Sequence, residues 1–344
     1  MEEPNATERR KSQHIEICLN ERVEGERITT GFERYRFRHQ ALPEIDYAAV
    51  RTDTEFLGRK LGAPFLISSM TGGTEQASNI NRNLAVLAQT RGWAYGVGSM
   101  RAAIERPELM ETFRVRRFAP DIPILANLGA VQLNYGFGYD ECMRAAEKLE
   151  ADALVLHLNS LQEAFQPEGN TDFRGLLKRI GELCRRLPFP VGVKEVGWGI
   201  AADVSERLAD AGVAFLDVAG AGGTSWSQVE KHRSADPVAR LAAEAFADWG
   251  IPTAECVREV RRQLPDIPLI ASGGLANGVD AAKSLALGAH LAGFGRSLLL
   301  PAVTSPDMLS SLAERLEREL RTAMFGIGAA TIAELRATDR LASI

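Results

Sequence analysis

Eight short apolar segments recur along the chain, and most of them end in small or polar residues. Their near-continuous apolarity, without alternation, is typical of parallel strands that are buried on both faces. Most intervals run roughly 25–37 residues, which suits a strand, a helix and two loops, and eight such units predict an α/β fold, a TIM (β/α)8 barrel. The apolar segments are residues 64–68, 93–97, 122–126, 153–157, 189–194, 214–218, 268–271 and 291–295. Segments of helical period between them are residues 139–149, 175–186, 203–211 and 279–287.

The predicted barrel covers residues 61–325, with an N-terminal extension over residues 1–60 and a C-terminal tail over residues 326–344. The interval after the sixth strand, residues 218–268, is longer than the others, and it includes a charged run at residues 230–233. We expect an extended loop over the barrel mouth there. A doubly wound sheet is the structural alternative, although eight evenly spaced strands favour the barrel. Further predicted elements are a helix near residues 8–20, a mixed stretch over 31–43 and a closing helix over 307–324.

Composition narrows the range of functions. The chain has 344 residues, of which 45% are hydrophobic and 25% charged, with a net charge of −5. A general nucleic-acid surface is therefore not expected. The four cysteines are far apart and form no CxxC or His/Cys pattern, which argues against a disulfide framework or a zinc site. No signal-peptide core or membrane span is evident, so we expect a cytoplasmic protein.

Polar residues cluster directly after the fourth predicted strand, and they are the strongest functional signal. His157 and Asn159 are two residues apart, so on a strand they point to the same side. Gln162 offers a neutral hydrogen-bonding group, and Glu163 a hard oxygen ligand for a cation such as Mg²⁺. In parallel α/β proteins, ligands bind at the carboxyl ends of the strands. A polar loop with a solvated glutamate is the alternative.

Two glycine-containing loops follow the last two predicted strands. Ser272-Gly273-Gly274 comes after the seventh strand, and Gly295-Arg296 comes after the eighth. TIM barrels often bind a phosphate at these loops through backbone N–H groups and a helix N-terminus, and Arg296 could add charge. Each loop by itself is more often a simple turn.

Small and amide-bearing residues at successive strand ends suit a flat heteroaromatic ring, and a lysine can stabilise negative charge on such a ring. Together with the phosphate loops, they indicate a flavin mononucleotide (FMN) site. For Lys194 the alternative is a structural ion pair, since a buried lysine needs a partner and Glu195 is adjacent. The strand-end residues are Ser69, Met70 and Thr71 after the first strand, Ser99 after the second, Asn127 after the third, Lys194 at the end of the fifth and Thr224 beyond the sixth.

Arg10, Lys11 and His14 share one broad face of the predicted N-terminal helix. Two cations and a histidine on one face make a good diphosphate clamp. A solvated charged helix is the plainer interpretation of this face.

Taken together, these residues resemble the type 2 isopentenyl-diphosphate isomerases, over nearly the whole chain from about Glu8. The chain departs from many relatives after Gly274, where Leu275-Ala276-Asn277 stands in place of an early arginine. The motifs that carry the resemblance are Arg10-Lys11-x-x-His14, Phe37-Arg38-x-Gln40-Ala41-Leu42-Pro43, Ser69-Met70-Thr71-Gly72-Gly73, Gly98-Ser99-Met100-Arg101, His157-x-Asn159-x-Leu161-Gln162-Glu163, Thr171-Asp172-Phe173-Arg174-Gly175, Val193-Lys194-Glu195-Val196-Gly197, residues 220–226 and Ser272-Gly273-Gly274.

The resemblance implies a 1,3-proton shift between isopentenyl and dimethylallyl diphosphate. It implies reduced FMN and Mg²⁺, NADPH as a usual reductant, and a homo-oligomer, either a tetramer or an octamer. Gln162 and Lys194 would be catalytic, and Glu163 would bind Mg²⁺. The implied substrate residues are Arg10, Lys11, His14, Arg101, His157, Asn159 and Gln162. The implied FMN residues are Ser69, Met70, Thr71, Ser99, Asn127, Lys194, Thr224, Gly273, Gly274, Gly295 and Arg296.

Three other functions are alternatives to this one. FMN-dependent 2-hydroxy-acid oxidases carry Asn-His-Gly-Gly-Arg after the sixth strand, whereas residues 220–224 here are Gly-Ala-Gly-Gly-Thr and lack both the base and the carboxylate clamp. A barrel like inosine-monophosphate dehydrogenase needs a nucleophilic cysteine in that region, and none lies between Cys184 and Cys256. A non-catalytic flavin-binding protein is the alternative from a different class.

Overall fold

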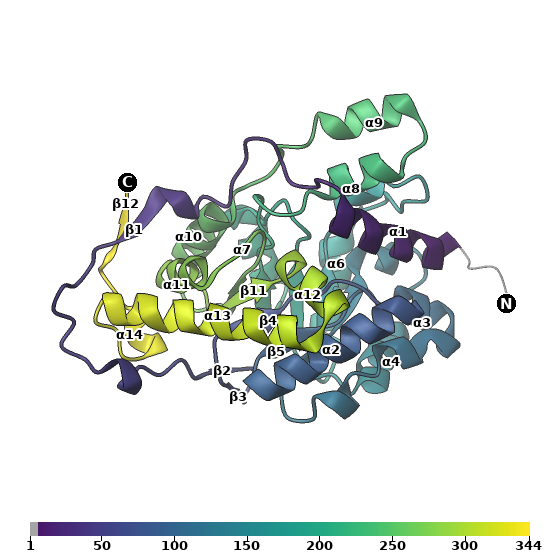
Figure 1. The fold of residues 1–344 in the computed structure, drawn as a ribbon. Coiled ribbons are helices and arrows are strands. Elements are labelled where there is room, and N and C mark those ends of the chain that lie inside the picture. The colour runs from purple at the N-terminus through teal and green to yellow at the C-terminus, as the bar shows by residue number, and fades with distance from the viewer. Residues whose placement is uncertain (1–5) are drawn as a thin grey trace.

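A closed barrel of eight parallel strands forms the centre of the computed structural model, which describes residues 6–344 (Figure 1). The order β4-β5-β6-β7-β8-β9-β10-β11 closes by pairing β11 with β4, which confirms the predicted barrel. Each predicted apolar segment overlaps one strand. The strands are β4 (Phe65–Ile67), β5 (Ala94–Gly96), β6 (Ile124–Gly129), β7 (Ala153–His157), β8 (Val191–Lys194), β9 (Phe215–Asp217), β10 (Leu269–Ala271) and β11 (Leu291–Phe294).

One strand differs from its prediction in a way that affects the site. β6 does not end at residue 126, because it stays paired with β7 as far as Gly129 opposite His157. Asn127 therefore lies within β6 rather than after it. This extension places Asn127 directly beside the polar end of β7.

Helices follow most of the strands and cover the outside of the barrel (Figure 1). The predicted helix at 139–149 is confirmed, and the other predicted helices differ from the structure at their ends. For example, α6 begins after its N-cap residue Gly175, which has a φ of 67°. The α-helices are α1 (Ala6–Asn20), α2 (Glu75–Arg91), α3 (Arg101–Glu105), α4 (Tyr139–Leu149), α5 (Ser160–Phe165), α6 (Leu176–Arg186), α7 (Ala202–Asp210), α8 (Trp226–Arg233), α9 (Pro237–Glu244), α10 (Thr253–Gln263), α11 (Gly278–Ala286), α12 (Arg296–Thr304), α13 (Pro306–Gly326) and α14 (Ile332–Arg336). Short 3₁₀ helices are η1 (Phe32–Arg34), η2 (Tyr47–Ala49), η3 (Pro107–Phe113), η4 (Arg116–Phe118) and η5 (Ala130–Asn134).

A hairpin closes the end of the barrel at which the strands begin. Its strands β2 (Thr54–Phe56) and β3 (Arg59–Leu61) contribute Phe56 and Leu61 to the apolar cluster inside the barrel. The ring of Phe56 packs edge-on against Phe215, the first residue of β9, with 5.5 Å between centroids. The opposite end, where the strands finish, is therefore the end left for ligands.

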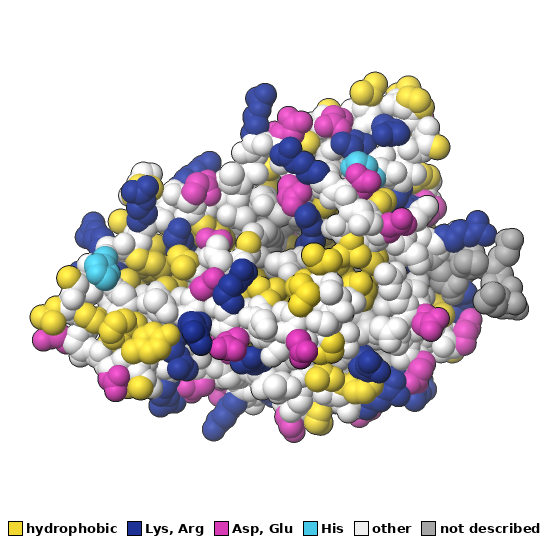
Figure 2. All heavy atoms as spheres, viewed as in Figure 1, with side chains coloured by type: hydrophobic (Ala, Val, Ile, Leu, Met, Phe, Trp, Pro, Cys, Tyr) yellow, Lys and Arg dark blue, Asp and Glu magenta, His cyan; other side chains and the backbone are white. Residues whose placement is uncertain are grey.

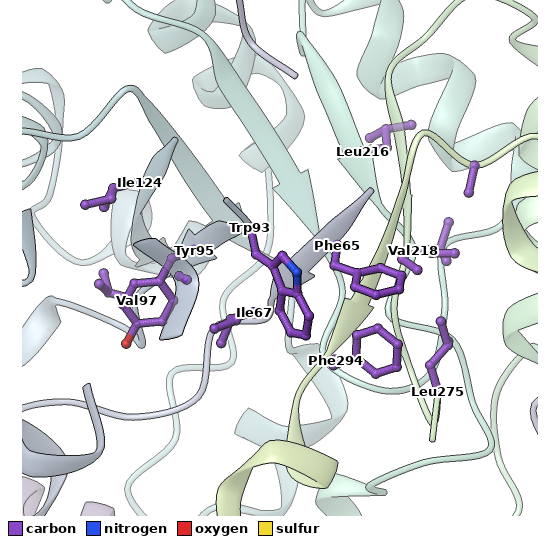
Figure 3. Close-up of a cluster of buried hydrophobic side chains, with 14 of the residues drawn as sticks. Phe65, Ile67, Trp93, Tyr95, Val97, Ile124, Leu216, Val218, Leu275 and Phe294 are labelled. Atoms are coloured by element: carbon purple, nitrogen blue, oxygen red, sulfur yellow. The ribbon is translucent and has the colours of Figure 1, made fainter. Parts of the chain in front are cut away.

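A second apolar layer lies between the strands and the helices, and Figure 3 shows part of it. Phe65 contacts Trp93 and Phe294 edge-on, with centroid separations of 5.0 and 5.2 Å. All three side chains are fully buried, and each such burial contributes about 1.5–3 kcal/mol relative to exposure. This packing gives the strand ends a rigid base.

The long interval after β9 is not an extended loop, because it folds into α8 and α9 before the barrel helix α10. α9 buries only Ala243 and exposes Val238 and Leu241, and Figure 2 shows hydrophobic side chains on its outer face. The N-terminal extension also meets the C-terminal tail: β1 (Tyr35–Phe37) pairs antiparallel with β12 (Leu341–Ser343), so the predicted tail is partly ordered into a sheet. Among the described residues, no helix combines the length and apolarity needed to cross a membrane.

Candidate active site

Helix α1 turns its basic face toward the barrel mouth rather than toward solvent. Lys11 Nζ donates to the Ser99 carbonyl at 3.0 Å and lies 5.2 Å from the centroid of the Phe113 ring. His14 Nε2 lies 2.9 Å from Glu230 Oε1 in α8, and Arg10 pairs with Glu168 at 3.7 Å. These contacts are not those of a solvated charged helix.

Burial changes the protonation of Lys11. Its pKa falls to about 7, mainly because burial disfavours the ammonium form and also because Arg10 and Arg106 are nearby cations. Lys11 is therefore close to half-protonated near neutral pH. An anion that binds beside it would favour the charged form.

Glu230 is a site residue that the sequence did not reveal. Its side chain is fully buried, and Oε2 accepts from Arg233 at 2.5 Å while Gln162 Nε2 lies 3.5 Å from Oε1. Burial alone would raise the pKa of Glu230, but the hydrogen bond from His14 and the charges of His14 and Arg233 hold it below its ordinary value. Glu230 thus joins α1, α5 and α8 through one carboxylate.

The end of β7 and the start of α5 form a compact polar cluster. Asn159 Nδ2 donates to Gln162 Oε1 at 3.1 Å and to Glu163 Oε1 at 2.9 Å. Glu163 Oε2 accepts a hydrogen bond from the backbone N–H of Asn170 at 2.5 Å, and the side chain of Glu163 is buried. Asn159 Oδ1 is also buried, and it has no hydrogen-bond partner among the described residues. A buried oxygen without a partner is unfavourable unless a ligand or an ion supplies one.

His157 is held in its neutral form at this cluster. Its Nδ1 lies 2.8 Å from Asn127 Oδ1, so the ring donates from Nδ1 and keeps Nε2 as the basic nitrogen. Burial, followed by the charges of Lys194 and Lys11, lowers the pKa of His157 to about 3. Arg101 Nη1 donates to Asn170 Oδ1 at 3.0 Å, which brings this arginine to the same cluster.

Lys194, at the end of β8, is buried and donates to the carbonyl oxygen of Glu195 at 2.5 Å. The Glu195 carboxylate turns away and accepts four backbone N–H groups of residues 196–199, so it does not form the ion pair that was the alternative role of Lys194. Burial raises the pKa of Asp217, and the charge of Lys194 acts against that rise. Lys194 therefore keeps donor capacity for another acceptor.

The two predicted phosphate loops come together at the ends of β10 and β11. Gly273 and Gly274 have φ angles of 105° and 76°. A Cβ added to Gly273 would lie 2.1 Å from Gly220 O, and one added to Gly274 would lie 2.6 Å from Gly222 O. The backbone N–H groups of Gly273, Gly274 and Gly295 donate to none of the described residues. Gly295 is also the N-cap of α12, and the helix dipole at this N-terminus favours an anion. Free N–H groups at a helix N-terminus fit the phosphate of FMN.

The remaining predicted flavin residues surround the mouth on the side of β4 and β5. Thr71 is buried, whereas Ser69, Met70 and Ser99 are half-buried, and Thr224 is half-buried beyond β9. Sequence reasoning missed Ser68, whose buried Oγ has no partner among the described residues. Its signal is its position at the end of a barrel strand, before Ser69.

Comparison with known proteins shows the family to which the chain belongs. The family described as FMN-dependent dehydrogenase matches residues 137–341. The chain is 53% identical to an isopentenyl-diphosphate delta-isomerase from Oceanobacillus iheyensis, with 96% of this chain and 95% of that protein covered. Isopentenyl-diphosphate delta-isomerases of Nostoc sp. and a Synechococcus sp. are 52% and 55% identical, covering 97% and 95% of this chain and 96% and 94% of theirs. The chain belongs to the isopentenyl-diphosphate delta-isomerase family.

Solved structures with a similar fold include proteins named for a different activity. A mandelate oxidase variant with benzaldehyde aligns with a TM-score of 0.66 at 19% identity, covering 96% of this chain and 93% of that one. At this identity the likeness supports the barrel alone. Membership of the isomerase family, together with the FMN-dependent dehydrogenase match, supports FMN as the cofactor.

Proposed function

We propose that the protein converts isopentenyl diphosphate to dimethylallyl diphosphate by a 1,3-proton shift that needs reduced FMN and Mg²⁺. The observation that carries this function is the near full-length identity of 52–55% to three proteins named for it. We also propose NADPH as the reductant, a cytoplasmic location and a homo-oligomeric state, tetramer or octamer, on the resemblance.

The substrate diphosphate is proposed to bind between α1 and the end of β7. A diphosphate carries about three negative charges, and charge-assisted contacts to arginine and lysine are the strong ones. Arg10, Lys11 and His14 point toward this region, and Arg101 reaches it through Asn170. Neutral His157 and Asn159 complete the polar wall.

Glu163 is proposed to hold Mg²⁺, with Asn159 Oδ1 as a second oxygen. No group of three or more His, Cys, Asp or Glu side chains that could hold a metal is found among the described residues. Mg²⁺ commonly binds through one or two carboxylates plus substrate phosphates and water, so one buried glutamate beside an unpartnered amide oxygen fits it. The diphosphate would supply further ligands.

Gln162 and Lys194 are proposed to act at the reacting carbons and the flavin. Reduced FMN supplies an acid–base nitrogen and an electron-rich face beside a developing tertiary cation. Gln162 lies against Glu230, which fixes the amide through Nε2. Lys194 is buried at the barrel end, where its Nζ would donate a hydrogen bond to negative charge on a reduced ring.

The test is an assay of the purified full chain with FMN and Mg²⁺, before and after reduction by NADPH or dithionite under anaerobic conditions. We expect conversion of isopentenyl diphosphate only after reduction. If the reduced protein does not isomerise the substrate, the proposal is wrong. Bleaching of bound FMN by a 2-hydroxy acid would instead support the oxidase alternative.

A further inference from the structure

A strap formed by residues 21–31, between α1 and η1, runs along the loops that hold the flavin phosphate. Val23 O accepts from the Ser225 amide at 2.7 Å, Glu24 forms an antiparallel bridge with Thr224, and Thr30 O accepts from Ala254 N at 2.9 Å. These contacts attach the N-terminal extension to the segments that follow β9.

The strap and the glycine loops are in contact through their backbones. A Cβ added to Gly222 would lie 2.1 Å from Thr30 N, and one added to Gly274 would lie 2.6 Å from Thr30 Cγ2. Neither loop has room for a side chain at these points. The strap therefore forms one wall of the phosphate site.

Arg296 is tied to this wall by a single contact. Its Nη1 donates to Glu24 Oε1, and its side chain is about one third exposed. Nε and Nη2 donate to none of the described residues. An arginine binds phosphate best through two parallel N–H groups, and this edge stays available while Nη1 is held.

We propose that Glu24 is a positioning residue for the FMN phosphate: it holds Arg296 so that the strap, outside the barrel, determines the preference for FMN over riboflavin. Riboflavin lacks only the phosphate, so the difference between the two affinities isolates the phosphate site. The inference rests on FMN binding and not on the isomerase activity.

Glu24 has two effects on the affinity for FMN, and these effects have opposite signs. A carboxylate near a phosphate dianion repels it, so removal of that charge alone tightens FMN binding. Removal of the anchor frees a side chain with large rotamer entropy, which the phosphate must then order by itself. We expect the second effect to prevail and Glu24→Ala to weaken FMN binding about tenfold, while riboflavin binding changes less than twofold.

The matched control is Glu26→Ala in the same strap. Glu26 is exposed, and its side chain makes no hydrogen bond or ion pair with the described residues. This variant measures the charge effect alone, so its FMN affinity should equal or exceed that of the wild type. A loss of FMN affinity in Glu24→Ala but not in Glu26→Ala identifies the anchor.

The experiment titrates flavin-free full-length protein with FMN and with riboflavin and follows quenching of flavin fluorescence. Arg296→Gln and the double variant Glu24→Ala/Arg296→Gln complete a cycle, in which Glu24→Ala should no longer weaken FMN binding once Arg296 is replaced. The proposal is overturned if Glu24→Ala binds FMN as tightly as the wild type, or if Glu24→Ala still weakens FMN binding when Arg296 is already replaced. Equal loss of FMN and riboflavin would also overturn it, because that result indicates a damaged barrel mouth.

Discussion

The pKa of Lys11 near 7 predicts the pH dependence of substrate capture. If the protonated ammonium binds the diphosphate, the competent fraction of free enzyme falls as pH rises through 7. About one tenth of Lys11 is charged at pH 8 and about one hundredth at pH 9, so kcat/KM should fall about tenfold per pH unit on the alkaline side. Bound diphosphate raises the pKa of Lys11, so the corresponding fall in kcat should begin at a higher pH.

Two substitutions separate Lys11 from other titrating groups. Lys11→Arg carries a permanent charge, so the alkaline fall in kcat/KM should flatten. Arg10→Ala removes a cation that lowers the pKa of Lys11, so the fall should move to higher pH although kcat/KM drops. The pKa of buried Glu195 is also about 7, and a contribution from this carboxyl would survive in both variants.

The assay is isomerase activity of the reduced holoenzyme between pH 6 and 9, with FMN content measured in each sample. An alkaline fall of the same slope and midpoint in wild type and Lys11→Arg would refute the reasoning, because the titrating group would then lie elsewhere. A complete loss of activity in Lys11→Arg makes Arg10→Ala the deciding variant. If Lys11 is the group that titrates, the midpoint pH of the alkaline fall in kcat/KM must be higher in Arg10→Ala than in the wild type.

Three further predictions follow from the site. Glu163→Gln should need much more Mg²⁺ for half-maximal rate, whereas Gln162→Ala should lower kcat at saturating Mg²⁺; a normal Mg²⁺ midpoint in Glu163→Gln would place the metal elsewhere. Gly274→Ala should lose FMN and about 1–3 kcal/mol of stability, measured by thermal unfolding, because its φ is 76° and no space exists for a Cβ. Glu230→Ala should cost about 1–3 kcal/mol in denaturant unfolding, since His14 and Arg233 lose a buried acceptor while Arg233 keeps its ion pair with Glu168; no measurable loss would show that the Glu230 carboxylate is unimportant for stability.

The barrel could be predicted because each of its strands is a short apolar run, buried on both faces. The α8–α9 segment could not, since α9 buries only Ala243 and leaves Val238 and Leu241 exposed, so it has no apolar stripe toward a core. β6 extended past its prediction because pairing with β7, a tertiary contact, includes Asn127 and Gly129.

Local motifs revealed the loops of the site but not the pairs that join them. His14 and Glu230 are 216 residues apart in sequence, and Arg296 and Glu24 are 272 apart. No spacing rule connects such positions. Glu230 was visible only as part of a charged run, and a charged run predicts solvent exposure rather than a fully buried carboxylate.

The difference in activity between this family and the oxidases of the same fold has to arise outside the barrel strands. The mandelate oxidase structure shares the barrel fold, yet residues 220–224 here lack the histidine and arginine expected of a 2-hydroxy-acid oxidase. The cations suited to a diphosphate come from α1, and the carboxylate that fixes His14 comes from α8. The proposed diphosphate site therefore takes α1 cations from outside the barrel, while the proposed flavin site lies at the strand ends. α1 and the strap are one continuous segment that packs closely on the glycine loops, so the same extension contacts both proposed sites.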